Sequence, residues 1–372
     1  MRIRKDNIIA FLMLLPSLIL LGIFVYGFIG QTVYVSLTDW GQNAAQALAI
    51  NPELAFVGLA NYRDLFTGAL ETRFRQDLVN TFFFTIFFLA GCLGLGLGLA
   101  ILLDQNVRGE AVFRTIFLFP FALAFIVTGT IWRWMLQPQG GLNVLPTSIG
   151  LPQLDLLWLA SREQIWQFNW QNLPIYIGAT ATLVMLLLTY RAWRQRRQRA
   201  LWVRGGLAVL FAALSLFVLP QVSILPFPET HGFNVAFIGI ILAAVWQLSG
   251  YTMALYLAGL RGIPEALREA ARVDGASEPQ VYWHVVLPML GPITLSAMII
   301  LGHISLKIFD LVFAMAGADN ATTDVPALLM YLRSFRANQF AEGAAIAVVL
   351  LILVAMVIVP YLWQSLRGET KR

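Results

Sequence analysis

The chain has 372 residues, of which 59% are hydrophobic and only 12% charged, and its mean hydropathy is +0.73. A water-soluble domain carries about 25% charged residues, so this chain has too little polar surface to cover itself in water. The net charge of +5 comes from short basic clusters between apolar runs, which is typical of a membrane protein and gives no support to nucleic-acid binding. The composition therefore predicts an integral membrane protein.

Eight stretches contain the roughly 20 mostly apolar residues that a helix needs to cross a bilayer. They lie at 8–29, 78–103, 113–135, 174–190, 205–225, 235–260, 289–315 and 343–363. The fold class expected from them is an all-α integral membrane protein with eight transmembrane helices in one domain, 1–372. Placing the N-terminus in the cytoplasm puts most of the 25 Lys and Arg residues inside, so both termini are expected to be cytoplasmic.

The densest basic cluster holds six arginines between Arg191 and Arg204. It separates two apolar stretches, so it is expected to form a cytoplasmic turn between two helices. Its simplest interpretation is a stop-transfer anchor, and a binding site for anionic lipid is the alternative.

The sequence gives no support for chemistry carried out by the chain itself. Cys92 is the single cysteine, and His231, His284 and His303 are scattered, so neither a catalytic residue nor a metal site is expected. None of the three lysines is followed by serine or threonine, which excludes a P-loop for ATP.

Two features inside the spans predict helix packing. Glycines recur in the second span at 91, 94, 96 and 98, where a neighbouring helix could approach closely. Lys307 and Asp310 are three residues apart, so they are expected to share one helix face and neutralise each other. A direct role of this pair in solute binding or gating is the alternative.

The most informative polar segment is 262–292, between the sixth and seventh spans on the cytoplasmic side. Pro264 suits the start of a helix, Gly275 suits its end, and a second short helix is expected from Ser277 to about Val286. The first helix combines small apolar residues with a ring of charges. A helix lying passively at the membrane surface would have the same composition.

This segment contains three short signatures, EAA at 269–271, DGA at 274–276 and LP at 287–288. Their spacing resembles the EAA motif of permease subunits in binding-protein-dependent ABC importers. Further matches to the carbohydrate branch of that family are FVGLANY at 56–62, RT at 114–115, IW at 131–132, AGL at 258–260 and IP at 263–264. The resemblance covers 8–160 and 233–363 and is strongest to the maltose, alpha-glucoside and trehalose permease type.

The resemblance implies a non-catalytic subunit whose EAA helix docks in a cleft of an ATPase subunit. The residues implied in this coupling are Glu265, Arg268, Glu269, Ala270, Ala271, Asp274 and Gly275. The chain would form half of a translocation pathway in a bacterial inner membrane. Its implied partners are a second related permease, two ATPase subunits and an extracytoplasmic solute-binding protein. No cofactor would be bound by this chain, and ATP and Mg would be bound by the ATPase subunits.

Two regions depart from the family pattern. The family has six core spans, whereas this chain inserts an extra helical hairpin at about 162–234 into the permease core at 78–363. The outer loop after the seventh span carries Gly317-Ala318-Asp319-Asn320 where the family has Gly-Gly-Pro. The hairpin is interpreted as peripheral, with a partner contact as the alternative.

Sugars are commonly bound by stacking on aromatic rings together with hydroxyl and amide partners. The candidates in the sixth and seventh spans are Trp246, Gln247, Ser249, Tyr251, Thr252, His303 and Ser305. Hydrogen bonding between helices is the alternative for each of them. The expected solute is a sugar, glycoside or polyol. The alternative function is a stand-alone secondary carrier, which would favour more carboxylates within the membrane than this chain has.

Overall fold

The computed structural model describes residues 5–43, 45–46, 53–69, 71–105, 107–225 and 227–369. The first four and last three residues lie outside these ranges, so the predicted placement of the termini falls partly there. The α-helices are α1 (Lys5–Leu21), α2 (Phe28–Ser36), α4 (Ala60–Thr67), α5 (Thr72–Leu103), α6 (Glu110–Leu118), α7 (Phe125–Met135), α8 (Gly141–Val144), α9 (Leu173–Arg194), α10 (Gln198–Ala213), α11 (Phe237–Arg261), α12 (Glu265–Val273), α13 (Glu278–Val281), α14 (Leu287–Met289), α15 (Gly291–Leu306), α16 (Asp310–Ala316), α17 (Pro326–Tyr331) and α18 (Phe340–Glu369). Two strands complete the fold, β1 (Gln164–Asn169) and β2 (Thr230–Asn234).

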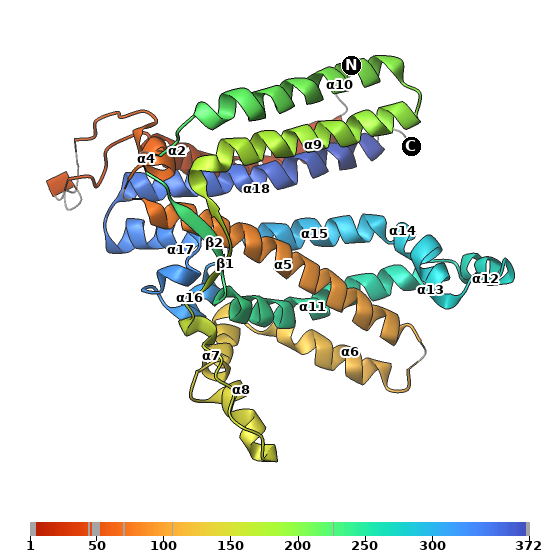
Figure 1. Ribbon diagram of the computed structural model, residues 1–372. Coiled ribbons are helices and arrows are strands. Elements are labelled where there is room, and N and C mark those ends of the chain that lie inside the picture. Colours follow the sequence, from red (N-terminus) through yellow and green to blue (C-terminus); the bar gives the residue numbers. More distant parts are fainter. Residues whose placement is uncertain are drawn as a thin grey trace.

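Within the described residues, six helices are long and apolar enough to cross a membrane, and the number rises to eight when each of two bent helix pairs is taken as one span. This confirms the all-α membrane fold. Figure 1 shows α5, α11 and α15 running side by side in the bundle, with α9 and α10 along one flank. At 32 residues α5 is about 48 Å long, so its two ends extend beyond a hydrocarbon core of about 30 Å.

The span predicted over 113–135 is not one continuous helix. The chain there forms α6, a 3-10 turn from Phe119 to Ala122, and α7, and the two arms are bent by 98°. The arms separate at Leu123 and Ala124, whose backbone is extended, and Pro120, three residues before Leu123, has no backbone N–H for an α-helical hydrogen bond. The freed carbonyl of Leu123 accepts a hydrogen bond of 2.7 Å from Nε2 of Gln247 on α11. Such compensation allows a helix to break within the membrane.

The apolar stretch predicted as a span over 289–315 is also not one continuous helix. Helix α15 ends at Leu306, Lys307 is its C-cap, and α16 begins only at Asp310. Lys307 and Asp310 therefore do not share a helix face, and no ion pair joins them in the described part of the chain. The helix is interrupted between these two residues, and their spacing of three in the sequence did not predict that interruption.

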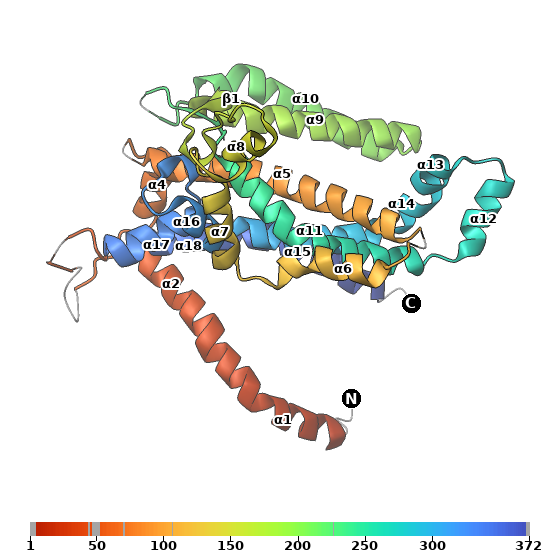
Figure 2. The ribbon, with the colours of Figure 1, turned by 90° about the horizontal axis from the view of Figure 1, so that it is seen from below.

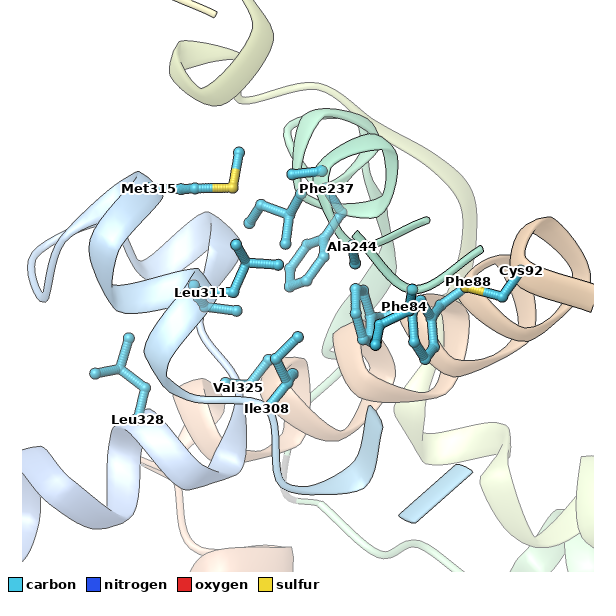
Figure 3. Close-up of a cluster of buried hydrophobic side chains, with 14 of the residues drawn as sticks. Phe84, Phe88, Cys92, Phe237, Ala244, Ile308, Leu311, Met315, Val325 and Leu328 are labelled. Atoms are coloured by element: carbon cyan, nitrogen blue, oxygen red, sulfur yellow. The ribbon is translucent and has the colours of Figure 1, made fainter. Parts of the chain in front are cut away.

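The central packing contact joins α5 to α11. A side chain at Gly91 would come within 2.6 Å of Val245, and one at Gly96 would overlap the Thr252 hydroxyl. The glycine prediction is correct for these two positions, whereas Gly94 and Gly98 have open space around them. The largest apolar cluster includes one part of this contact, where Figure 3 shows rings of α5 and α11 facing the side chains of α16 and the segment around 325.

Residues 162–234 form the hairpin α9–α10, whose base is a two-stranded antiparallel sheet that the sequence analysis did not predict. Strand β2 follows Glu229, whose carboxylate accepts hydrogen bonds of 2.8 and 2.5 Å from Nε and Nη2 of Arg75 on α5. Arg75 is completely buried, and a ring nitrogen of His231 lies 2.5 Å from the same carboxylate. The hairpin is therefore attached to the bundle at its base by a buried ion pair.

The first span leaves the bundle. Helix α2 packs against α18, and the backbone N–H of Ala341 donates a 2.9 Å hydrogen bond to the Trp40 carbonyl beside it. Figure 2 shows α1 directed away from the other helices. The span occupies Phe11–Ser36, so it extends seven residues beyond the predicted end at 29.

Candidate functional site

Helix α12 and the segment that follows it extend beyond one end of the bundle (Figure 1). Pro264 precedes the helix as its N-cap, and Glu265 in the first turn and Arg272 in the last turn suit the helix dipole. The nine-residue helix is too short to be stable by propensity alone. Its position therefore depends on contacts with the ends of the spans.

Gly275 ends the helix through its backbone conformation. Its φ of +86° lies in the left-handed region, which favours glycine. The Gly275 N–H donates to the Arg272 carbonyl and the Ala276 N–H to the Ala271 carbonyl, both at 3.0 Å, which is the Schellman pattern. The glycine of the motif thus has a local structural role, because it turns the chain from α12 toward α13.

Arg268 attaches α12 to the ends of two spans. It is the one buried residue of the helix, and its Nη1 lies 2.9 Å from Oδ2 of Asp104, directly after α5. Its Nη2 donates a 2.9 Å hydrogen bond to the carbonyl of Leu260 near the end of α11. Asp104 is the C-cap of α5, where its negative charge is unfavourable for the helix dipole, and the guanidinium offsets that charge.

A second arginine connects α12 with α13. Arg272 lies 2.9 Å from Glu265 and 2.6 Å from Glu278, and these hydrogen bonds raise the pKa of the guanidinium further above its usual value. The pairs are exposed, so solvent screens them and each contributes little to stability. The Ser277 N–H donates a 2.8 Å hydrogen bond to the Gln280 side chain at the start of α13. These contacts fix the direction of the turn more than they stabilise it.

The outer face of α12 is apolar. Ala266, Ala270 and Val273 follow helical spacing, and they lie on the side opposite Arg268. All three are exposed, and Val273 is 87% exposed, an unusual state for a valine. Leu267 is also 44% exposed on the flank. A folded helix that turns such a face to solvent is suited to contact another protein.

The structure places the seven predicted coupling residues on one short segment, in three different environments. Arg268 and Ala271 face the bundle, Glu265, Glu269 and Ala270 are exposed, and Asp274 and Gly275 form the turn. Asp104 was missed by the sequence analysis, although it is the partner of Arg268. A charge directly after an apolar span was the available signal, but it gives no information about which residue it contacts.

The predicted solute residues of α11 lie mostly against the broken third span. Trp246 meets Trp132 edge to face at 6.0 Å between ring centroids, and Tyr251 stacks on Phe121 at 5.2 Å. The side-chain amide of Gln247 donates a hydrogen bond to the Leu123 carbonyl in the break. Its Oε1 is buried without a hydrogen-bond partner in the described structure. Ser249 is buried nearby. The two aromatic rings are therefore presented along one element, α6–α7.

Two other candidates have their hydroxyls engaged between helices. The Thr252 hydroxyl lies 2.7 and 2.8 Å from the carbonyl oxygens of Cys92 and Ser249, and its one proton is shared between them. Ser305 donates to the Gly302 carbonyl and accepts from Thr85 of α5 at 2.9 Å. Both side chains are fully buried, and these bonds match the alternative of helix–helix contact. His303 is partly buried on α15.

The loop at 317–320 is held in place from two sides. Arg73 of α5 donates to the Ala318 carbonyl at 3.2 Å and forms an ion pair with Asp324. The Asn320 amide donates to the Leu159 carbonyl at 3.0 Å, and its oxygen accepts from Thr322. Burial raises the pKa of Asp324 to about 6, although Arg73 opposes this shift. Residues 317–320, which depart from the expected Gly-Gly-Pro, thus form an ordered loop.

We expect Arg268→Ala to destabilise the protein by about 2 kcal/mol, because Asp104 has a 10% exposed side chain and would lose its counter-charge. The measurement is thermal unfolding in detergent. In a double-mutant cycle, Asp104→Asn combined with Arg268→Ala should cost less than the sum of the single changes. Arg272→Ala is the matched control and should destabilise the protein less than Arg268→Ala, because its ion pairs are exposed to solvent. Additive effects of the two single changes would contradict the assigned contact.

Residues 92–368 match the family of binding-protein-dependent transport system inner membrane components. The chain is 35% identical over its whole length to a probable ABC transporter permease protein of Pyrococcus horikoshii, all of which is covered. It is 31% identical to the xylose/arabinose import permease protein of Haloferax volcanii, over 93% of this chain and 84% of that protein.

Among solved structures, a bacterial ABC transporter involved in the import of the polysaccharide alginate has a chain with the same fold. The TM-score is 0.59 at 18% identity, over 95% of this chain and 94% of that one. None of these matches favours a stand-alone carrier. The chain belongs to the family of binding-protein-dependent transport system inner membrane components.

Proposed function

We propose that this permease forms half of the pathway of a type I ABC importer for a sugar or glycoside, driven by ATP hydrolysis in partner subunits. The observation that carries the proposal is the exposed apolar face of α12, which lies beyond the bundle and opposite the buried Arg268. This face would insert into a cleft of an ATPase subunit. Relatives that import carbohydrates support the solute class.

The implied assembly contains a second related permease, two ATPase subunits and an extracytoplasmic solute-binding protein. ATP and Mg would be bound by the ATPase subunits and not by this chain. The family name, which refers to binding-protein-dependent transport, supports the last of these partners. A solved alginate importer in complex with its periplasmic protein has the same fold in its permease.

The seven coupling residues keep distinct roles in this proposal. Ala270 and Glu269 would contact the ATPase, Arg268 would transmit force to α5 and α11, and Gly275 would fix the turn. Among the solute candidates, Trp246 and Tyr251 offer rings, and Gln247 offers a buried amide oxygen without a partner. Thr252 and Ser305 have weaker support, because their hydroxyls already bond to neighbouring helices.

We expect Ala270→Asp to lower solute uptake about tenfold or more, because a charge without a partner would be buried in the contact with the ATPase. Uptake and copurification of the ATPase are measured together at matched expression. The matched control is Ala111→Asp, which adds the same charge at an exposed position in the first turn of α6. Full uptake by Ala270→Asp would overturn the docking assignment.

Tyr251→Ala tests the aromatic lining. Its ring stacks on Phe121 beside the break in the third span. If sugar stacks there, uptake should fall by different factors for different sugars while the complex still assembles. The measurement is uptake across a substrate series, together with copurification. Phe121→Ala, which removes the partner ring, is the comparison. Equal loss for all sugars with poor assembly would assign Tyr251 to packing alone.

The orientation can be tested at the hairpin turn. Gln198 is exposed between the arginines, and Cys92, the native cysteine, is buried. In a Cys92→Ser background, Gln198→Cys should resist an impermeant thiol reagent in intact cells and react in inverted vesicles. A cysteine at Leu151, which is exposed in the loop after α8, should show the reverse pattern. Labelling of Gln198→Cys in intact cells would refute the proposed cytoplasmic side.

A further inference from the structure

The turn between α9 and α10 forms a basic cavity. The cavity has a volume of about 550 Å³, and its lining includes Trp193, Arg194, Arg196 and Arg197. Arg196 has a φ of +53°, and the Arg197 N–H donates a 3.0 Å hydrogen bond to the Ala192 carbonyl, so the turn is tight. Three arginines thus line one concave surface.

These charges have no counter-ion within the hairpin. The sequence contains no acidic residue from Gln164 to Pro228. Arg194, Arg196 and Arg197 form no ion pair with any acid in the described ranges, in contrast to Arg75, Arg268 and Arg272 elsewhere in the chain. An anion from outside the chain can therefore bind these arginines without breaking an ion pair of the described residues.

The start of α10 adds to this positive potential. Arg197 is its N-cap, no side chain caps the helix, and no acid lies in its first turn. The free N–H groups of a helix N-terminus bind anions, and phosphate in particular. The guanidinium groups and the helix end thus favour the same ligand chemistry, a phosphate ester that accepts several hydrogen bonds.

The location favours lipid as the source of that phosphate. Figures 1 and 2 show the turn at the same end of the molecule as α12, but α12 extends farther from the bundle. Trp193 and Tyr190 beside the cavity are 63% and 53% exposed, as aromatic residues at a membrane interface are. The Arg194 guanidinium lies 5.9 Å from the centroid of the Tyr190 ring.

We propose that this cavity binds the phosphate of an anionic phospholipid of the cytoplasmic leaflet. Binding there would fix the end of a hairpin that is joined to the bundle through a buried ion pair at its other end. A stop-transfer anchor needs only positive charge, which lysine supplies equally. A phosphate site built from guanidinium forks loses affinity when arginine becomes lysine.

The experiment measures phospholipid retained by the purified transporter complex in detergent, using native mass spectrometry with phosphatidylglycerol and phosphatidylcholine as probes. Arg194→Gln with Arg197→Gln should lower the retained phosphatidylglycerol about tenfold or more and leave phosphatidylcholine unchanged. Arg194→Lys with Arg197→Lys should give an intermediate loss. The matched control, Arg108→Gln with Arg114→Gln, removes two exposed arginines elsewhere and should retain wild-type binding.

Three results would overturn the proposal. The first is equal retention of phosphatidylglycerol by the wild type and the glutamine variant. The second is an equal loss in the control variant, which would indicate a diffuse charge effect. The third is displacement of the lipid by inorganic phosphate at the same concentration, which would assign the cavity to a water-borne anion. Loss of the ATPase subunits from the glutamine variant without any loss of lipid would favour a protein contact instead.

Discussion

The close contact between α5 and α11 is the constraint on which the rest of the structure depends. In a membrane, helices gain little from hydrophobic association with each other, so they depend on close packing and on hydrogen bonds between them. Gly91 and Gly96 provide the space on α5, and the Thr252 hydroxyl of α11 donates to the Cys92 carbonyl across the contact. A side chain at either glycine would separate the two helices and every group that they align.

Both ends of this helix pair are held by charged contacts. Where α5 begins, Arg75 pairs with Glu229, which precedes β2 and leads into α11. Where α5 and α11 end, Asp104 and the Leu260 carbonyl bind Arg268 of α12 together. A displacement of α12 would therefore act on the ends of α5 and α11 at once. This is the physical basis on which a partner at α12 could influence helices that carry predicted solute residues.

The sequence alone was sufficient to predict those features that depend on a single local property of the chain. Apolar length located the spans, and the EAA-type signatures located α12 and its terminal glycine, because Gly275 at positive φ is a local requirement. The contacts of the same helix were not predictable, since Asp104 is 164 residues from Arg268. The sheet at the hairpin base was missed for the same reason, because Gln164 pairs with Asn234, 70 residues later.

The broken spans show why hydropathy alone fails within the membrane. An apolar stretch predicts a continuous helix because each backbone group must be satisfied inside the bilayer. At the third span that requirement is met differently, since Gln247 of α11 donates to Leu123 and thereby satisfies one carbonyl of the break. The sequence analysis gave this glutamine as a candidate solute ligand, but its side-chain NH2 group donates the hydrogen bond to Leu123. Its remaining Oε1 is buried without a partner, so one polar residue can both stabilise the bend and offer an acceptor beside it.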